Sequence, residues 1–205
     1  DLNRSAELDP YGFNTAYLRG LVYYLTGHFD EAADEYCRCM ALSRDTESQY
    51  LAESGEAPGD PRHCMVIPSD DRSRIAITMW MYRALRRADR DQEATELLET
   101  VSEGLSLSDG PTRYESSTIK PGSNEHYYRT LLLHRGLLEE EEILDREKLQ
   151  GLWPTVAYGV AVYHLLEGNQ ERAVSLLREI VDEPYWARFG HVAAEAELIR
   201  LEQEP

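Results

Sequence analysis

The stretch AYLRGLVYYLTGHFDEAADEYCRCMAL, residues 16–42, decides the fold class. In its first half, apolar residues recur at the spacing of a one-sided helix. These residues are Leu18, Leu21, Val22 and Leu25. Gly27 and His28 interrupt the pattern, and a second periodic run follows to residue 40. The stretch predicts two antiparallel helices, with the small residues Gly20 and Ala32 where they cross, because short side chains let two backbones approach closely.

The same layout recurs further along the chain. GHFDEA (27–32), DRDQEA (89–94) and GNQERA (168–173) each begin with a turn residue and reach an alanine five positions later. An apolar-periodic helix precedes each of these segments, and another follows it. A weaker copy surrounds Gly136, where Glu141 stands in place of the alanine, so we expect its helices to pack differently. Internal repetition of helical hairpins is typical of an α-solenoid.

This arrangement resembles the tetratricopeptide repeat family, whose units of about 34 residues are antiparallel helix pairs. The resemblance extends over much of the chain. It rests on Gly20, Tyr23, Gly27, Ala32 and Tyr36 in the first complete unit, Ala94 and Leu98 in the second, and Ala161, Gly168, Ala173 and Leu177 in the last. It implies an all-α solenoid of such hairpins with a C-terminal capping helix and two long inter-repeat loops.

The resemblance also predicts boundaries. Residues 1–10 (DLNRSAELDP) match the tail of a preceding repeat, whose first part would lie upstream, because a helix pattern stops there at Asp9-Pro10. The following segments are a repeat over 11–43, an insertion loop over 44–72, a repeat over 73–102, a loop over 103–123, a degenerate repeat over 124–150, a repeat over 154–183 and a capping helix over 185–203. The insertion is expected because Ala32 and Ala94 lie much further apart than one unit. In the capping helix we expect Phe189, Val192, Ala193 and Leu198 to face inward, and Glu195, Glu197, Arg200 and Glu202 to face water.

Composition and charge limit the kinds of partner. The formal net charge of -17 repels nucleic-acid backbones and anionic membrane surfaces. No stretch approaches the roughly 18 apolar residues of a membrane helix, so we expect no direct membrane insertion. A protein or peptide partner is expected, and a basic segment, an uncharged peptide and a second copy of the chain all remain open.

Three cysteines leave their pairing open. Cys37 and Cys39 lie two residues apart on a predicted helix, where their side chains point in different directions, so a disulfide between them is not expected. Cys64 lies in a predicted loop and can reach either one. The alternative is that all three are small buried or free thiols.

The resemblance implies where a partner would bind, because the first helix of each pair lines the inner wall of such a stack. We expect partner segments to lie along this wall, which is aromatic and basic. The candidate partner-binding residues are Asn14, Tyr17, Leu21, Tyr24, Met79, Arg83, Arg86, Arg87, His126, Tyr158 and Val162.

Four arginines, at 83, 86, 87 and 90, lie within two turns of one predicted helix. Guanidinium groups suit carboxylates. The cluster therefore either anchors an acidic or C-terminal peptide group of a partner, or pairs with carboxylates of this chain. The family's carboxylate-clamp members use lysine and asparagine at set inner positions, and that pattern is not reproduced here.

Neither a metal site nor a catalytic site is predicted. His28 with Asp30 and Glu31, His63 with Cys64, and the run 139–142 all lack the ligand spacing of zinc or calcium sites. The sequence has no phosphate-binding glycine loop and no nucleophile elbow. We therefore expect a non-catalytic protein-interaction scaffold without a cofactor.

The sequence also suggests an alternative, structural function and a cellular location. The alternative is a subunit that assembles with itself or a larger complex through an uncapped N-terminal end, because exposed apolar edges tend to be covered. The C-terminal run PYWARFGHVAAEAELIRLE is similar to bacterial repeat proteins that often carry export signals. This similarity favours a bacterial periplasmic or exported location over the cytoplasm.

Overall fold

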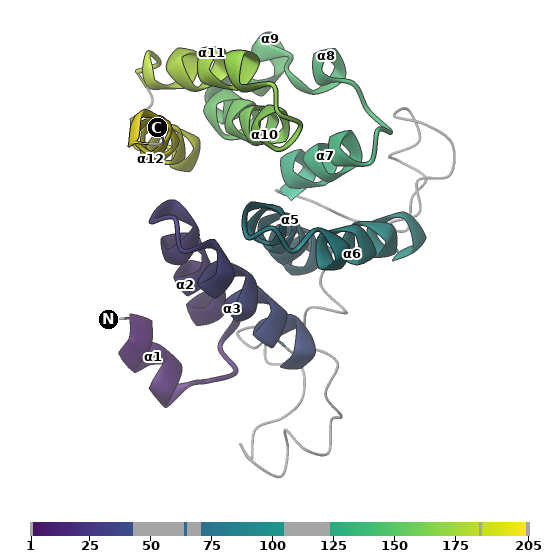
Figure 1. Ribbon diagram of the computed structural model, residues 1–205, viewed down its shortest axis with the longest axis vertical. Helices are drawn as coiled ribbons and strands as arrows, with labels where there is room; N and C mark the ends of the chain where they lie inside the picture. Colours follow the sequence, from purple (N-terminus) through teal and green to yellow (C-terminus); the bar gives the residue numbers. More distant parts are fainter. Residues whose placement is uncertain (1, 43–63, 65–70, 105–123, 185, 204–205) are drawn as a thin grey trace. The chain divides into compact units, whose positions relative to one another are not determined.

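The computed structural model describes residues 2–42, 64, 71–104, 124–184 and 186–203 (Figure 1). Within these ranges the regular elements are helices and there is no β-strand, which confirms the all-α prediction. None of the described helices combines the length and apolar character needed to span a membrane. The two predicted loops lie largely outside the described residues. The continuous solenoid remains a prediction.

The helices are grouped into two compact units, Asp1–Ala94 and Thr95–Pro205. The first contains α1 (Leu2–Leu8), α2 (Phe13–Leu25), α3 (Phe29–Leu42), α5 (Asp71–Arg87) and the start of α6 (Asp91–Gly104). The second continues with α7 (Glu125–His134), α8 (Glu140–Ile143), α9 (Arg146–Leu149), the 3-10 turn η4 (Gln150–Leu152), α10 (Trp153–Leu166), α11 (Gln170–Val181) and α12 (Phe189–Gln203). The predicted hairpin partners α2 and α3 pack against each other, and so do α10 and α11. Helices α5 and α6 lie where the sequence predicts the third clear hairpin.

Four helices end with the same backbone geometry. The second residue after the end adopts a left-handed conformation in each case: Gly27 (φ 82°), Asp89 (φ 57°), Gly136 (φ 66°) and Gly168 (φ 75°). The next amide then donates a hydrogen bond of 2.8 or 2.9 Å to the carbonyl five residues back, as from His28 to Tyr23, Arg90 to Leu85, Leu137 to Leu132 and Asn169 to His164. This is the Schellman ending. The repetition seen in the sequence is therefore present in the backbone, including the weak copy at Gly136.

Small residues lie where the helices pack, as predicted. The five positions are all buried: Gly20, Ala32, Ala94, Ala161 and Ala173. A Cβ atom built on Gly20 would lie 2.4 Å from ring carbons of Tyr36 on α3. The α2–α3 pair can therefore pack this closely only because residue 20 lacks a side chain.

The helix α10 is the central element of the second unit, where α7, α11 and α12 all pack against it. Its apolar residues are distributed around the whole circumference, and the run from Val156 to Val162 is buried throughout. A helix that is apolar on all sides is expected to be enclosed by others.

The predicted inward face of α12 is only partly correct: Ala193 is buried and Glu195 and Glu202 are exposed as expected, but two positions are reversed. Val192 is 44% exposed, whereas Glu197 is only 1% exposed. The residues that α12 buries are Gly190, His191, Ala193, Ala194 and Glu197. These positions recur at helical spacing, and the small residues among them let the backbone of α12 approach α10. The helix is thereby rotated so that Glu197 turns inward, where it forms an ion pair with Arg200.

A disulfide resolves the open question about the cysteines. Cys39 on α3 is bonded to Cys64, with 5.4 Å between their Cα atoms. Cys37 remains a free thiol. Of the two partners that the sequence allowed for Cys64, the structure selects the one further along α3.

Candidate functional site

Six of the eleven predicted inner-wall residues are buried among packed helices. They are Leu21, Tyr24, Met79, Arg83, Tyr158 and Val162. The ring of Tyr24, for example, contacts those of Phe29 and Trp80 at centroid distances of 5.2 and 5.3 Å. These six side chains belong to the protein's interior and offer no open surface to a partner. The reason is that their helices are covered on more than one side, whereas the inner wall of a stack would be open.

The other five predicted residues are accessible to different degrees. Asn14 is exposed, and Tyr17, Arg86, Arg87 and His126 are partly exposed. The ring of Tyr17 stacks on that of Phe13 on the same helix. The first four residues belong to the first unit, and His126 belongs to the second.

The arginine cluster makes contacts within its own unit. Arg83 lies over the ring of Trp80, Arg87 lies over that of Phe29, Arg86 pairs with Asp91, and Arg90 pairs with Asp34 and Glu93. The hydrogen bond to Glu93 is the largest influence on Arg90 and holds the pKa of its guanidinium above the usual value. The structure thus favours the alternative in which these arginines pair inside the chain.

A pocket of about 440 Å³ lies in the second unit, between α7 and the stretch from α8 to η4. It contains His126, one of the accessible predicted residues. The pocket combines an apolar floor with a charged rim. Its lining residues are Glu125, His126, Arg129, Glu142, Ile143, Asp145, Lys148, Leu149 and Leu152.

Local capping interactions form one wall of this pocket. The run 139–142 is a helix start, because the amide of Glu139 donates to a carboxylate oxygen of Glu142 at 2.8 Å in a capping box. Arg129 on α7 donates from Nη2 to the carbonyl of Glu142 at 2.7 Å, and this bond joins the two walls.

A second cap holds the next turn of the wall. Asp145 begins α9 by accepting a hydrogen bond from the amide of Lys148 at 3.1 Å, and its carboxylate also lies 2.6 Å from Nζ of that lysine. The side-chain hydrogen bond and the backbone hydrogen bond from Lys148 lower the pKa of the Asp145 carboxyl. Asp145 and Lys148 of the rim therefore form an ion pair, and Arg129 and Glu142 form hydrogen bonds with backbone groups.

The floor of the pocket is apolar and partly open. Ile143 is buried, Leu149 is exposed only in part, and Leu152 is 46% exposed. A volume of about 440 Å³ falls within the range of roughly 300–1,000 Å³ that is typical of ligand pockets. The apolar lining gives room for an apolar side chain. The described residues contain no group of three or more His, Cys, Asp or Glu placed to hold a metal ion.

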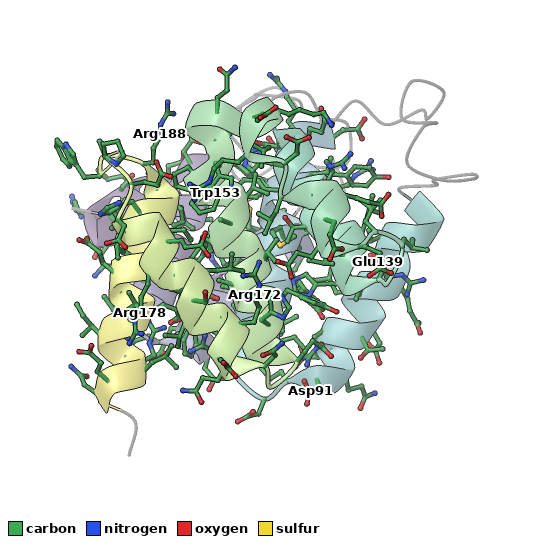
Figure 2. All side chains as sticks on the ribbon, turned by 90° about the horizontal axis from the view of Figure 1, so that it is seen from above. Asp91, Glu139, Trp153, Arg172, Arg178 and Arg188 are labelled. Atoms are coloured by element: carbon green, nitrogen blue, oxygen red, sulfur yellow. A yellow bond between two sulfur atoms is a disulfide. The ribbon has the colours of Figure 1, made fainter. Side chains whose placement is uncertain are left out.

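A three-residue charge network fixes the position of α8. Glu140 accepts hydrogen bonds from Arg172 on α11, labelled in Figure 2, and its other oxygen lies 2.6 Å from Nε2 of His164 on α10. Burial opposes ionisation of Glu140, but the hydrogen bonds from Arg172 and His164 outweigh it and lower the pKa of the carboxyl. The network ties three helices together and thereby supports the pocket wall. No sequence pattern indicates this network, because its members are far apart along the chain.

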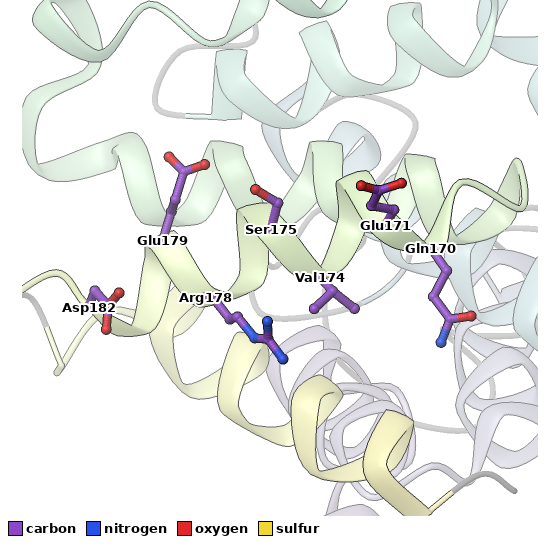
Figure 3. Close-up of a pocket in the computed structure, with 7 residues that line it drawn as sticks. All are labelled: Gln170, Glu171, Val174, Ser175, Arg178, Glu179 and Asp182. Carbon is purple, nitrogen blue, oxygen red and sulfur yellow. The ribbon is translucent and has the colours of Figure 1, made fainter.

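A second hollow, of about 660 Å³, lies along the outer surface of α11 (Figure 3). Its lining residues are Gln170, Glu171, Val174, Ser175, Arg178, Glu179 and Asp182. Six of the seven lie on α11 and Asp182 directly follows its end, and only Val174 among the seven is apolar. The hollow is therefore a shallow polar surface, and the pocket beside α7 is the stronger candidate site.

No family model matches the chain, and no significant match exists among curated proteins or solved structures.

Proposed function

We propose that this chain is a non-catalytic protein-interaction module of the tetratricopeptide type, and that it binds a segment of a partner protein in the pocket between α7 and the α8–η4 stretch. The observation that carries the proposal is this pocket, with its apolar floor and its charged rim. The four matching helix endings support the repeat architecture, because they recur where the hairpin pattern predicts turns.

The pocket's chemistry favours one apolar side chain as the anchor of the bound segment. Leu152 is 46% exposed and stands beside Leu149 and the buried Ile143, so an incoming apolar group would gain free energy by covering them. His126 and Arg129 on the opposite wall provide polar groups at the rim, where they can orient the backbone of an extended segment.

The charge of the chain favours a segment that is basic or uncharged outside this anchor. A formal net charge of -17 attracts cationic partners at long range and repels anionic ones. The arginine cluster 83–90 does not oppose this preference, because its guanidinium groups contact rings and carboxylates of the chain itself.

Selection from a displayed peptide library, followed by nuclear magnetic resonance, tests the proposal. We expect selected peptides to share one large apolar residue, and a selected peptide to shift the amide resonances of His126, Leu149 and Leu152 most strongly in the labelled chain. The proposal is contradicted if no peptide is enriched, or if the largest changes fall on α11 around Val174.

A second candidate function is self-assembly through the first unit. Leu18 and Val22 lie one turn apart on α2 and are 46% and 48% exposed, and Leu8 on α1 is 70% exposed. Beside them is a hollow of about 230 Å³ lined by Leu2, Asn3, Arg19, Val22 and Tyr23. Exposed apolar side chains at one end of a unit favour an interface with another copy of the chain or a larger complex.

Sedimentation velocity over a concentration series tests this second candidate. Self-assembly predicts a sedimentation coefficient that rises with concentration, and Val22→Asp should abolish the rise. Val192→Asp is the matched control, because Val192 is 44% exposed on α12. A wild-type chain that stays monomeric throughout, or equal behaviour of both variants, contradicts self-assembly through α2.

A further inference from the structure

The disulfide brings together three segments of the first unit that are far apart in sequence. Cys39 and Cys64 are bonded, and both side chains are fully buried. The amide of Cys64 donates a hydrogen bond of 2.8 Å to the carbonyl of Tyr11, just before α2. Arg38, the neighbour of Cys39, donates from Nη1 to the carbonyl of Pro10 at 2.6 Å. The turn between α1 and α2 is therefore held from both sides of the disulfide.

The third cysteine is separated from this cluster by helix geometry. Two residues along an α-helix correspond to a rotation of about 200°, so Cys37 and Cys39 point to different sides of α3. Cys37 lies near Arg90, and burial raises the pKa of its thiol. A thiol with a raised pKa forms less thiolate at neutral pH and exchanges with disulfides less readily. Geometry and chemistry both leave Cys39 as the partner of Cys64.

We propose that Cys39 and Cys64 form a redox clasp, which closes when the chain matures in an oxidising compartment and opens under reducing conditions. Disulfides persist in such compartments and are rare where cellular thiols keep cysteines reduced. The clasp would stabilise the first unit only in its oxidised form. This proposal does not depend on the proposed binding function.

The Cys39–Cys64 bond forms by two successive thiol–disulfide exchanges with an external disulfide, which belongs either to an oxidoreductase or to an oxidised small thiol. One cysteine thiolate attacks a sulfur of the external disulfide, forms a mixed disulfide and releases one external thiolate. The other cysteine thiolate then attacks the protein sulfur of the mixed disulfide, which forms the Cys39–Cys64 bond and releases the second external thiolate. The two cysteines lose two electrons and two protons, and the external disulfide takes up both and leaves as two thiols.

The expected effect on stability is large for one cross-link. A bond that closes a loop of this size restricts the unfolded chain much more than the folded one. The two cysteines are 25 positions apart. Reduction is therefore expected to raise the unfolding equilibrium constant of the first unit roughly a hundredfold.

Peptide mapping tests the pairing directly. The chain is secreted into an oxidising compartment, its free thiols are alkylated without reductant, and it is digested with trypsin. Arg38 separates Cys37 from Cys39, so each pairing gives a different product. We expect peptide 39–44 joined to peptide 63–72, with peptide 20–38 alkylated. A join between 20–38 and 63–72, or alkylation of all three cysteines, overturns the proposal.

Denaturant unfolding with and without a phosphine reductant tests the consequence. Reductant should lower the unfolding midpoint of the wild type and of the matched control Cys37→Ser by the same amount. It should leave Cys39→Ser/Cys64→Ser unchanged, at the midpoint of the reduced wild type. If that double variant does not fold, the comparison of oxidised and reduced midpoints in the wild type and in Cys37→Ser is sufficient. Equal midpoints for the oxidised and the fully reduced wild type overturn the proposal.

Discussion

The substitution Gly190→Ala tests the packing of the second unit most sharply. Gly190 lies at the start of α12, against the first residues of α10. A Cβ atom built on it would lie 2.2 Å from the carbonyl oxygen of Pro154, 2.4 Å from its carbonyl carbon and 2.6 Å from the Cα of Thr155. All three are backbone atoms, so none can move aside by a side-chain rotation.

The cost of this substitution follows from those distances. Ordinary contacts of a Cβ atom begin near 3.4 Å, so α12 has to move away from α10 by about 1 Å. Overpacking a core usually costs about 1–3 kcal/mol. Because the collision here is with backbone atoms, we expect the free energy of unfolding to fall by about 3 kcal/mol. Without the collision, alanine in place of glycine would stabilise a helix by about 0.5–1 kcal/mol. The sign of the change is therefore diagnostic.

Urea unfolding, followed by circular dichroism, measures this change. Gly151→Ala is the matched control, because a Cβ there meets only the end of the flexible Arg188 side chain, at 3.2 Å. We expect the control to change the free energy of unfolding by less than about 0.5 kcal/mol. The packing argument is refuted if Gly190→Ala is as stable as the wild type, or more stable.

Three further predictions concern the turns, the α2–α3 contact and the charge network. Asp89→Gly should raise the free energy of unfolding by about 0.5–1 kcal/mol, because φ is 57° at Asp89 and glycine adopts this conformation without strain. Gly168→Ala should lower the free energy of unfolding by about 1 kcal/mol, because φ is 75° at Gly168. Thermal melts in which both substitutions change the stability in the same direction would contradict this prediction. Gly20→Ala should cost about 2–3 kcal/mol in urea unfolding, because the buried ring of Tyr36 leaves no room for a Cβ, and a neutral result would count against it. The lowered pKa of Glu140 means that its ionised form stabilises the folded chain above the ordinary value of 4.5, and that this contribution is lost as the pH falls. Glu140→Gln should therefore lower the free energy of unfolding near neutral pH, and this free energy should then fall less between neutral and acidic pH than in the wild type. If it falls equally with pH in both proteins, the ionised Glu140 does not stabilise the fold in this way.

The hairpins and their small contact residues could be predicted from the sequence, because both leave local marks. The spacing of apolar residues indicates a helix, and a glycine followed five positions later by an alanine indicates a turn and a close contact. Gly20 and Ala173 are buried as this pattern requires. Even Asp89 occupies the left-handed position that glycine takes in the other three turns.

The inward face of α12 and the candidate site could not be predicted, because they depend on contacts between distant residues. Apolar and polar residues are mixed around α12, so periodicity does not determine which side packs, and the close contact of Gly190 decides it. The pocket depends on the short helices α8 and α9, which lie where the repeat pattern predicted one regular second helix. Of the residues predicted to bind a partner, only His126 lines this pocket.

The proposed binding of a partner segment in the pocket beside α7 is tested most directly by the affinity of a selected peptide for two matched leucine variants. Leu152→Asp places a charge on the pocket floor, whereas Leu137→Asp changes a leucine of similar exposure, 51%, that does not line the pocket. Fluorescence anisotropy should show binding at least about tenfold weaker for Leu152→Asp, because burial of the leucine's open half is worth about 1.4 kcal/mol. Leu137→Asp should bind like the wild type. Equal affinities for the two variants would contradict the claim.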